Sequence, residues 1–188
     1  NLNPNARAKG EIILINKPIG WSSFQAVKKI KYVTKAKKVG HAGTLDPLAS
    51  GLLIICTEQQ TKGIQDLQDA NKEYEGTLVL GATTPSYDME TEPNAHFPTE
   101  HITVAMVQSI ITQFLGEIEQ IPPLFSALKV NGKRAYTLAR QGATTVLKSR
   151  KITIHSLEFT RIELPEVDFR VRCTKGTYIR SLVFDIGR

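Results

Sequence analysis

Apolar positions along the chain follow two different periods, which predicts that both helices and strands are present. Phe24, Val27, Ile30 and Val33 recur every three residues, which is typical of a helix with one apolar stripe. Ser22 or Ser23 precedes this run and can cap the helix, because a serine hydroxyl accepts a hydrogen bond from a free amide of the first turn. Similar patterns predict further helices at residues 63–67, 102–115, 133–141 and 177–186.

Short apolar runs bounded by glycine and proline predict the strands. These runs cover residues 11–15, 52–56, 72–81, 126–130, 151–162 and 167–173. Residues 38–51 and 82–101 are expected to be irregular, because helix and strand breakers interrupt them. Strands and helices are mixed without a regular βαβ rhythm. We therefore expect an α+β fold, with a large mixed, mainly antiparallel β-sheet and flanking helices.

Composition restricts the class of protein. The chain has 188 residues, of which 41% are hydrophobic and 22% charged, as is ordinary for a globular protein. No apolar run approaches the roughly 20 residues of a membrane span. Residues 1–9 are polar and lack the apolar centre of a signal peptide, so we expect a cytoplasmic protein without a membrane partner.

The two cysteines and four histidines do not indicate a metal site. Cys56 and Cys173 lie in strand-like apolar runs, where we expect them to be buried thiols rather than a disulfide. The sequence has no C-x-x-C, and its histidines lack paired metal-ligand spacing. We therefore expect no metal.

The net charge is +6, which favours a polyanionic partner, because each neutralised phosphate releases counterions. Six lysines fall within eleven residues: Lys28, Lys29, Lys31, Lys35, Lys37 and Lys38. A second basic cluster comprises Lys129, Lys133, Arg134 and Arg140. Solvated helix faces also look like this, so charge alone leaves nucleic-acid binding open.

Residues 40–51, GHAGTLDPLASG, are the most informative segment. The glycines allow tight turns and a close approach of the backbone to a ligand. Pro47 fixes its own φ and favours an extended Asp46. Such a loop can present a carboxylate nucleophile, but a structural turn with a locally bonded aspartate fits the same residues. A phosphate-binding P-loop is excluded, because no Gly-Lys-Ser/Thr follows.

Five motifs, in order along the chain, resemble those of the TruB family of tRNA pseudouridine synthases. The central one is similar to the family's G-x-L-D-P-x-A-x-G signature at Asp46. The others are NKPIGWSS at residues 16–23, KEY at 72–74, IPPLFSALK at 121–129 and KGTYIR at 175–180. The resemblance implies the pseudouridine synthase fold and an isomerase that rearranges the T-loop uridine at tRNA position 55 without a cofactor.

The resemblance also implies roles for individual residues. Asp46 is the catalytic carboxylate acting on a flipped-out uridine, and Arg180 pairs with it. Tyr74 stacks on the uracil and assists the late proton removal from carbon 5. The positions implied to contact RNA are His41, which helps to displace the nucleotide, Tyr178, Lys17, Lys62, Gly43 and Thr44. Without the motifs, Tyr74 and Tyr178 fit half-buried structural positions better, and the motifs favour a functional role for both. Lys17 and Lys62 are equally compatible with structural roles.

The sequence departs from the family at two places. Pro85 stands where the family's T-D-T-x-D segment has an aspartate, although Asp88 is present. The chain has no initiating Met and stops at Arg188, so we expect a catalytic domain at residues 1–188 that is incomplete at its C-terminus. The helix with a substrate-contacting leucine and the PUA domain of family members are not in this sequence.

Three functions are compatible with these motifs. The favoured one is a stand-alone, monomeric enzyme acting on the T-stem-loop of tRNA. A guide-dependent, dyskerin-like relative shares the motifs but needs a guide-RNA particle. An RNA-binding chaperone without catalysis would not need Asp46.

Overall fold

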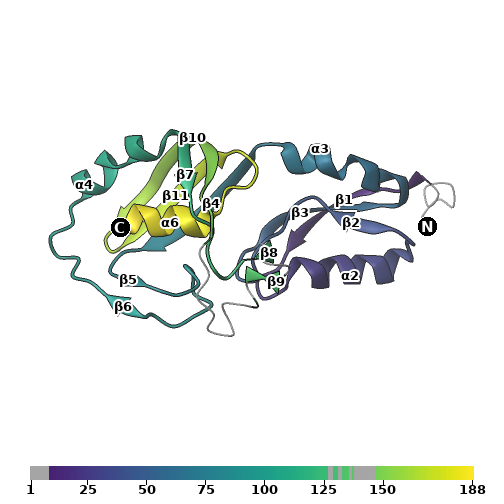
Figure 1. The fold of residues 1–188 in the computed structure, drawn as a ribbon, viewed down its shortest axis with the longest axis horizontal. Coiled ribbons are helices and arrows are strands. Elements are labelled where there is room, and N and C mark those ends of the chain that lie inside the picture. Colours follow the sequence, from purple (N-terminus) through teal and green to yellow (C-terminus); the bar gives the residue numbers. More distant parts are fainter. Residues whose placement is uncertain (1–8, 127–128, 131–132, 136, 138–146) are drawn as a thin grey trace. The chain divides into compact units, whose positions relative to one another are not determined.

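The computed structural model describes residues 9–126, 129–130, 133–135, 137 and 147–188. They form two compact units, residues 1–70 and 71–188, each with its own sheet and core. Within the described part, no helix is both long and apolar enough to cross a bilayer. Figure 1 shows the elements of both units.

The first unit is built on a three-stranded antiparallel sheet. Its strands lie in the order β1 (Ile12–Lys17), β3 (Gly51–Thr57) and β2 (Val39–His41). The predicted helix is present as α2 (Ser23–Thr34), and its Ala26 packs on Leu53 and Ile55 of β3. Of the predicted apolar stripe, Val27 and Ile30 pack on the sheet, whereas Phe24 and Val33 are 73% and 60% exposed, so only part of that stripe is buried.

A short helical segment packs on the other face of this sheet beside β2, whereas Ile12, Leu14 and Leu52 on that face are 51%, 66% and 61% exposed. It comprises the 3-10 helix η1 (Glu58–Gly63) and the helix α3 (Ile64–Asp69). Ile64 lies against Gly40 of β2, where an added Cβ would come within 2.6 Å of the Ile64 Cδ1 atom. A side chain at residue 40 would therefore displace the end of the Ile64 side chain.

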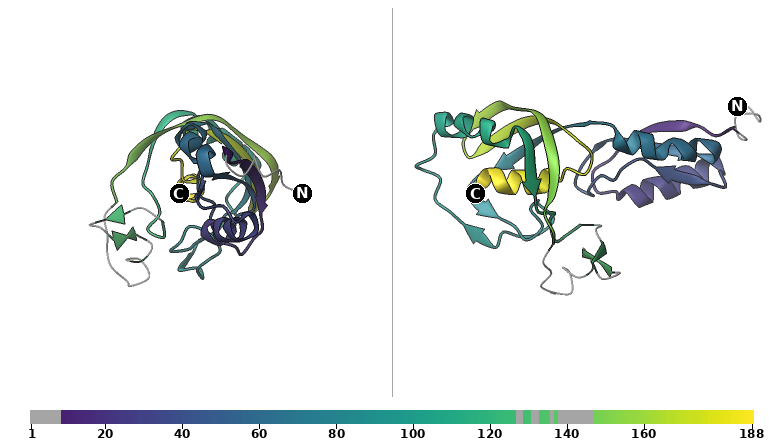
Figure 2. Two further views of the ribbon diagram at one scale, coloured as in Figure 1. Left: turned by 90° about the vertical axis from the view of Figure 1, so that its right-hand side faces the viewer. Right: turned by 45° about the horizontal axis from the view of Figure 1, so that its top comes forward.

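The second unit contains a four-stranded antiparallel sheet. Its strand order is β4 (Lys72–Val79), β11 (Glu166–Cys173), β10 (Arg150–Glu163) and β7 (Gly116–Gln120). The final helix α6 (Ile179–Gly187) packs on one face, and its Leu182 shares a core with Leu78 and Val171. Figures 1 and 2 show α6 lying along this sheet.

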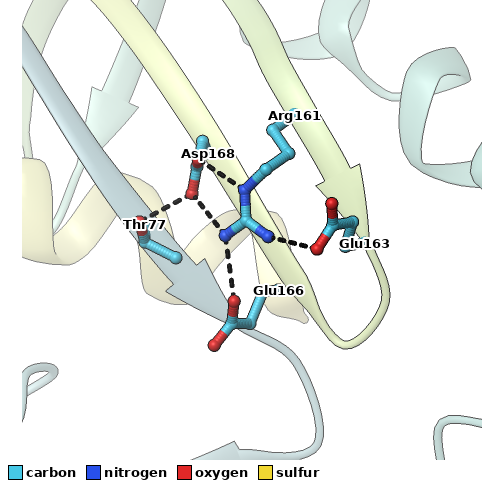
Figure 3. A network of polar contacts seen from close by, with 5 residues as sticks. All are labelled: Thr77, Arg161, Glu163, Glu166 and Asp168. Atoms are coloured by element: carbon cyan, nitrogen blue, oxygen red, sulfur yellow. Dashed lines mark hydrogen bonds and ion pairs between the residues drawn. The ribbon is translucent and has the colours of Figure 1, made fainter.

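The opposite face of the four-stranded sheet carries charged side chains. Arg161 of β10 forms ion pairs with Asp168, Glu166 and Glu163, and Thr77 of β4 donates to Asp168 (Figure 3). The burial pattern of β11 alternates strictly, with Val167, Phe169, Val171 and Cys173 inside. Alternation thus gives each strand one apolar and one charged face.

The predicted α+β class with antiparallel strands is confirmed. Among the described residues the strands divide between several sheets, and two of these sheets have only two strands each. The short pairs are β5 (Ala82–Thr83) with β6 (Ala95–His96) and β8 (Lys129–Val130) with β9 (Lys133–Arg134).

Several local predictions need correction. The helix predicted at 102–115 is divided at Ile110 into α4 (Val104–Ser109) and the 3-10 helix η2 (Ile111–Phe114). Of the helix predicted at 133–141, residues 133–134 form strand β9, residues 135 and 137 are helical as predicted, and residues 136 and 138–146 lie outside the described part. The segments predicted as irregular contain the short strands β2, β5 and β6.

The buried state predicted for the cysteines is confirmed. Cys56 and Cys173 are free thiols and both are 0% exposed. Burial raises the pKa of each thiol, so at neutral pH they act as small apolar residues.

Candidate active site

The predicted site residues are distributed over both units. Residues 1–70 contain His41, Gly43, Thr44, Asp46, Lys17 and Lys62. Residues 71–188 contain Tyr74, Tyr178 and Arg180. Each set is described within its own unit, and the ion pair between Asp46 and Arg180 stays a prediction.

Asp46 lies partly buried in the loop between β2 and β3. The residue before it is fixed by Ser23, which is 3% exposed. The Ser23 hydroxyl accepts a hydrogen bond from the Leu45 amide at 2.9 Å and donates one to the Leu45 carbonyl at 3.1 Å. One side chain of α2 therefore satisfies both backbone groups of Leu45.

The residue after Asp46 is fixed from the other side. The Pro47 carbonyl accepts from the Gly20 amide at 2.7 Å and from the Lys17 ammonium at 3.4 Å. The Asp46 carbonyl itself accepts from the Ala49 amide at 2.9 Å, which closes a turn. The backbone around the carboxylate is therefore held on both sides, as a preorganised catalytic group requires.

Lys17 organises this loop from inside the unit. Its side chain is 0% exposed, and its ammonium donates to the Trp21 carbonyl at 2.6 Å and to the Pro18 carbonyl at 2.9 Å, besides Pro47. Burial lowers the pKa of this ammonium, and the negative charge of Asp46 opposes that effect. The two charges are therefore close enough to influence each other.

His41 ends β2, where it pairs with Ile55 of β3. Its Nδ1 is hydrogen-bonded to the Gly43 carbonyl, which requires a proton on Nδ1. Gly43 has a φ of +109°, a conformation that favours glycine. Thr44 is exposed in the same loop, and Lys62 is exposed in η1.

The second unit fixes the start of α6 through a buried glutamine. Gln120 of β7 is 1% exposed; its amide nitrogen donates to the Tyr178 carbonyl at 3.2 Å, and its amide oxygen accepts from the Tyr178 amide at 3.0 Å. Ser181 donates to the Ile121 carbonyl at 2.6 Å. The Arg150 guanidinium lies 5.3 Å from the centre of the Tyr178 ring. Hydrogen bonds therefore hold the start of the IPP motif against the KGTYIR motif and the first turn of α6.

Arg180 of the KGTYIR motif also contacts the loop that contains Ser86. Its Nη1 donates to the carbonyl of Ser86 at 3.0 Å, and Ser86 is 0% exposed. The Ser86 hydroxyl in turn donates to the Asp88 carboxylate at 2.6 Å. Asp88 thus orders the loop that departs from the family at Pro85, and this loop supports Arg180.

Tyr74 lies on the helix-covered face of the four-stranded sheet. It is partly buried, pairs with Val171 of β11 and packs against the core of the second unit. Such a tyrosine has its ring fixed by packing while part of its surface stays accessible, which suits stacking on a base.

Several positioning residues were not predicted from sequence. Ser23 was considered only as an alternative cap, whereas the structure uses Ser22 as the cap, in a capping box with Gln25. Because one serine suffices to cap a helix, the presence of a second serine indicates that one of the two has another role. Gln120 and Ser86 gave no signal, since Gln120 binds the distant backbone of Tyr178 and Ser86 meets Arg180 only through its own carbonyl.

Side chains of these types can take part in acid–base, nucleophilic and stacking interactions. A held carboxylate can act as nucleophile or base, a guanidinium can stabilise it, and tyrosines can stack on a base. Among the described residues, no group of three or more histidines, cysteines and acids is arranged to hold a metal ion.

Comparison with curated proteins gives relatives over nearly the whole chain. The chain is 56% identical to tRNA pseudouridine synthase B of Flavobacterium johnsoniae, over 100% of this chain and 85% of that protein. It is 53% identical to the protein of the same name from Phocaeicola vulgatus, over 95% of this chain and 79% of the relative.

Among solved structures, a similar chain is found at lower sequence identity. A crystal structure of a Cbf5–Nop10–Gar1 complex contains a chain with 31% identity and a TM-score of 0.73. The match covers 97% of this chain and 45% of that one, so this chain spans less than half of the solved protein.

Residues 31–179 match the model of the TruB family pseudouridylate synthase N-terminal domain, which is well over half of the chain. The match includes Asp46 and Tyr74, whereas Arg180 follows its last residue. Because the family model matches most of the chain and the two relatives are more than 50% identical over at least 95% of it, the chain belongs to the TruB family of pseudouridylate synthases.

Proposed function

We propose that this chain converts the T-loop uridine at position 55 of tRNA to pseudouridine, with Asp46 as the catalytic carboxylate. The observation that carries the proposal is the loop of Asp46, in which Ser23 holds Leu45 while Gly20 and Lys17 hold Pro47. A structural turn would not need a buried lysine to position it. The relatives named tRNA pseudouridine synthase B support tRNA as the substrate.

The reaction breaks the N–C glycosidic bond, rotates the uracil and joins it to the sugar through carbon 5. Asp46 serves it as an ionised carboxylate that attacks or deprotonates the flipped-out nucleotide. Arg180, held at the Ser86 carbonyl, is proposed to pair with Asp46 and keep it ionised in a pocket that excludes water.

The remaining residues are proposed to bind and place the nucleotide. Tyr74 stacks on the uracil, and Tyr178 lines the same pocket. His41 fills the space that the flipped base leaves. Gly43, Thr44 and Lys62 are proposed RNA contacts from the first unit. Lys17 is better explained as a positioning residue, because its ammonium is buried against carbonyls.

The test uses the purified chain, a T-stem-loop RNA and mapping of pseudouridine. Asp46→Asn keeps the size of the side chain and removes its charge. We expect at least a thousandfold loss of turnover, roughly 4 kcal/mol of transition-state stabilisation, with RNA affinity nearly unchanged. Asp66→Asn, at an exposed acid of α3, is the matched control and should retain full activity. Normal turnover by Asp46→Asn would remove this residue from its role.

The same assay separates the two alternatives. A guide-dependent enzyme would leave bare T-stem-loop RNA unmodified until partner proteins and guide RNA are added. A chaperone would assist tRNA folding in the Asp46→Asn variant as well as in the wild type, and would form no pseudouridine. The chain is 56% identical to a relative named tRNA pseudouridine synthase B and 31% identical to a chain of the Cbf5–Nop10–Gar1 complex, which favours the first proposal.

A further inference from the structure

The outward face of α2 carries two aromatic rings that the core does not use. Phe24 and Tyr32 are 73% and 77% exposed, and Lys28 lies between them. Residues four apart lie above one another on a helix, so Phe24, Lys28 and Tyr32 form one line about 12 Å long. This line is called the aromatic–lysine stripe below.

Packing of α2 does not require the stripe. The opposite side of the helix, with Ala26, Val27 and Ile30, contacts the three-stranded sheet. The capping box of Ser22 and Gln25 fixes the start of the helix without Phe24. Single exposed apolar residues are common, but two large rings on one helix face give a larger apolar surface, which is typical of contact sites.

Charge identifies the partner that fits this surface. Lys31 and Lys35 flank the stripe, and α2 contains no acidic residue. Within the part of the chain that the structure describes, none of Lys28, Lys31 and Lys35 forms an ion pair. Residues 1–70 hold ten lysines and arginines against five acids, so +5 of the net charge of +6 belongs to this unit.

We propose that the aromatic–lysine stripe binds an unpaired segment of RNA outside the reaction pocket. Base faces stack on Phe24 and Tyr32, and phosphates contact Lys28, Lys31 and Lys35, which is the combination that single-stranded RNA sites use. The inference rests on the proposed function only in that the substrate is RNA. It adds a second contact, on α2, that holds the substrate beyond its target nucleotide.

A membrane surface fits the stripe less well. A helix that lies in a membrane interface presents a continuous apolar side with lysines at its border. Here Lys28 lies between the two rings. Alternation of single rings and single charges matches a nucleic-acid strand, whose bases and phosphates also alternate.

The experiment compares RNA binding by the full chain and its variants. The double variant Phe24→Leu/Tyr32→Leu keeps apolar surface and helix propensity but removes the stacking faces. We expect its Kd for an oligouridine strand and for a tRNA transcript to rise about tenfold, whereas kcat at saturating RNA stays at the wild-type level. Phe97→Leu, at a ring 56% exposed in the second unit, is the control and should bind as the wild type does.

A second variant tests the charges and does not alter the rings. Lys28→Gln/Lys35→Gln should reduce the slope of log Kd against log salt by about 1.4, because each of the two lost phosphate contacts on a single strand contributes roughly 0.7. Circular dichroism of both variants checks that α2 is retained.

The outcomes also separate this inference from the proposed function. Weakened RNA binding in both variants supports the stripe even if the chain forms no pseudouridine. Unchanged Kd values in both variants, with normal pseudouridine formation, overturn the stripe and leave the proposed function intact. Loss of binding to vesicles of equal phosphatidylglycerol and phosphatidylcholine, with RNA affinity unchanged, also overturns it.

Discussion

Lysine side chains are rarely buried, because an ammonium loses its hydration, yet Lys17 is 0% exposed. Its three carbonyl acceptors replace water, and one of them follows Asp46 directly. The resemblance to the family predicted a contact with RNA at this position. The geometry indicates that Lys17 acts through the backbone that carries Asp46.

Lys17→Met tests this at the scale of a residue. Methionine keeps the length of the side chain but leaves buried carbonyls without a donor, which should destabilise the first unit by about 1–3 kcal/mol. A positioning role predicts that kcat falls while the Kd for RNA hardly changes. Lys62→Met, at an exposed lysine, should leave stability unchanged. A raised Kd with normal kcat for Lys17→Met would instead support direct RNA contact.

Individual site residues could be predicted from sequence only where they lie in a recognisable motif. Asp46 follows from its glycine-rich loop and from the resemblance. Ser23 and Gln120 bind backbone groups distant in sequence, and Ser86 accepts from Arg180 through its own backbone carbonyl, so none of these contacts leaves a local pattern. The sequence therefore indicated Asp46, whose catalytic role stays a prediction, but gave no sign of the groups that hold its loop.

At the scale of elements, periodicity was informative for long segments. α2, β4, β10, β11 and α6 lie where the apolar pattern predicted them. Strands of two or three residues, such as β2, β5 and β6, contain too few positions to show a period. The break at Ile110 is invisible for a related reason, because a 3-10 turn keeps nearly the spacing of an α-helix.

The charged face of the four-stranded sheet gives a prediction for pH. Hydrogen bonds from Arg161, and then from Thr77, lower the pKa of the Asp168 carboxyl. A carboxyl whose folded pKa is below its unfolded value contributes stability above the unfolded pKa and loses it as pH falls through the folded pKa. Arg161 thus protects the sheet against acid.

Arg161→Leu should therefore unfold at a higher pH during acid titration, and NMR should show the pKa of Asp168 moving up toward its ordinary value. At neutral pH, three neighbouring acids also lose their shared cation (Figure 3). Lys151→Leu removes one exposed pair with Glu117 and should leave the acid midpoint almost unchanged. An unchanged midpoint in Arg161→Leu would show that the network does not stabilise the sheet.

At the scale of the whole molecule, the two units have separate cores. Leu53 and Ile55 pack with α2 in the first unit, whereas Leu182 packs with β4, β10 and β11 in the second. The division was not predicted, because the apolar pattern gives the elements but not which of them share a core. It matters for function, since the first unit carries Asp46 and the second carries Arg180.

Two matched leucine substitutions test whether the cores are separate cooperative units. Leu53→Ala and Leu182→Ala each remove a side chain that is at most 2% exposed, at a cost of about 2–5 kcal/mol. Hydrogen exchange should then speed up at the amides of β1 and β3 in the first variant, and at those of β10 and β11 in the second, because opening follows local cores. Equal acceleration in both units for either variant would mean that the molecule unfolds as one.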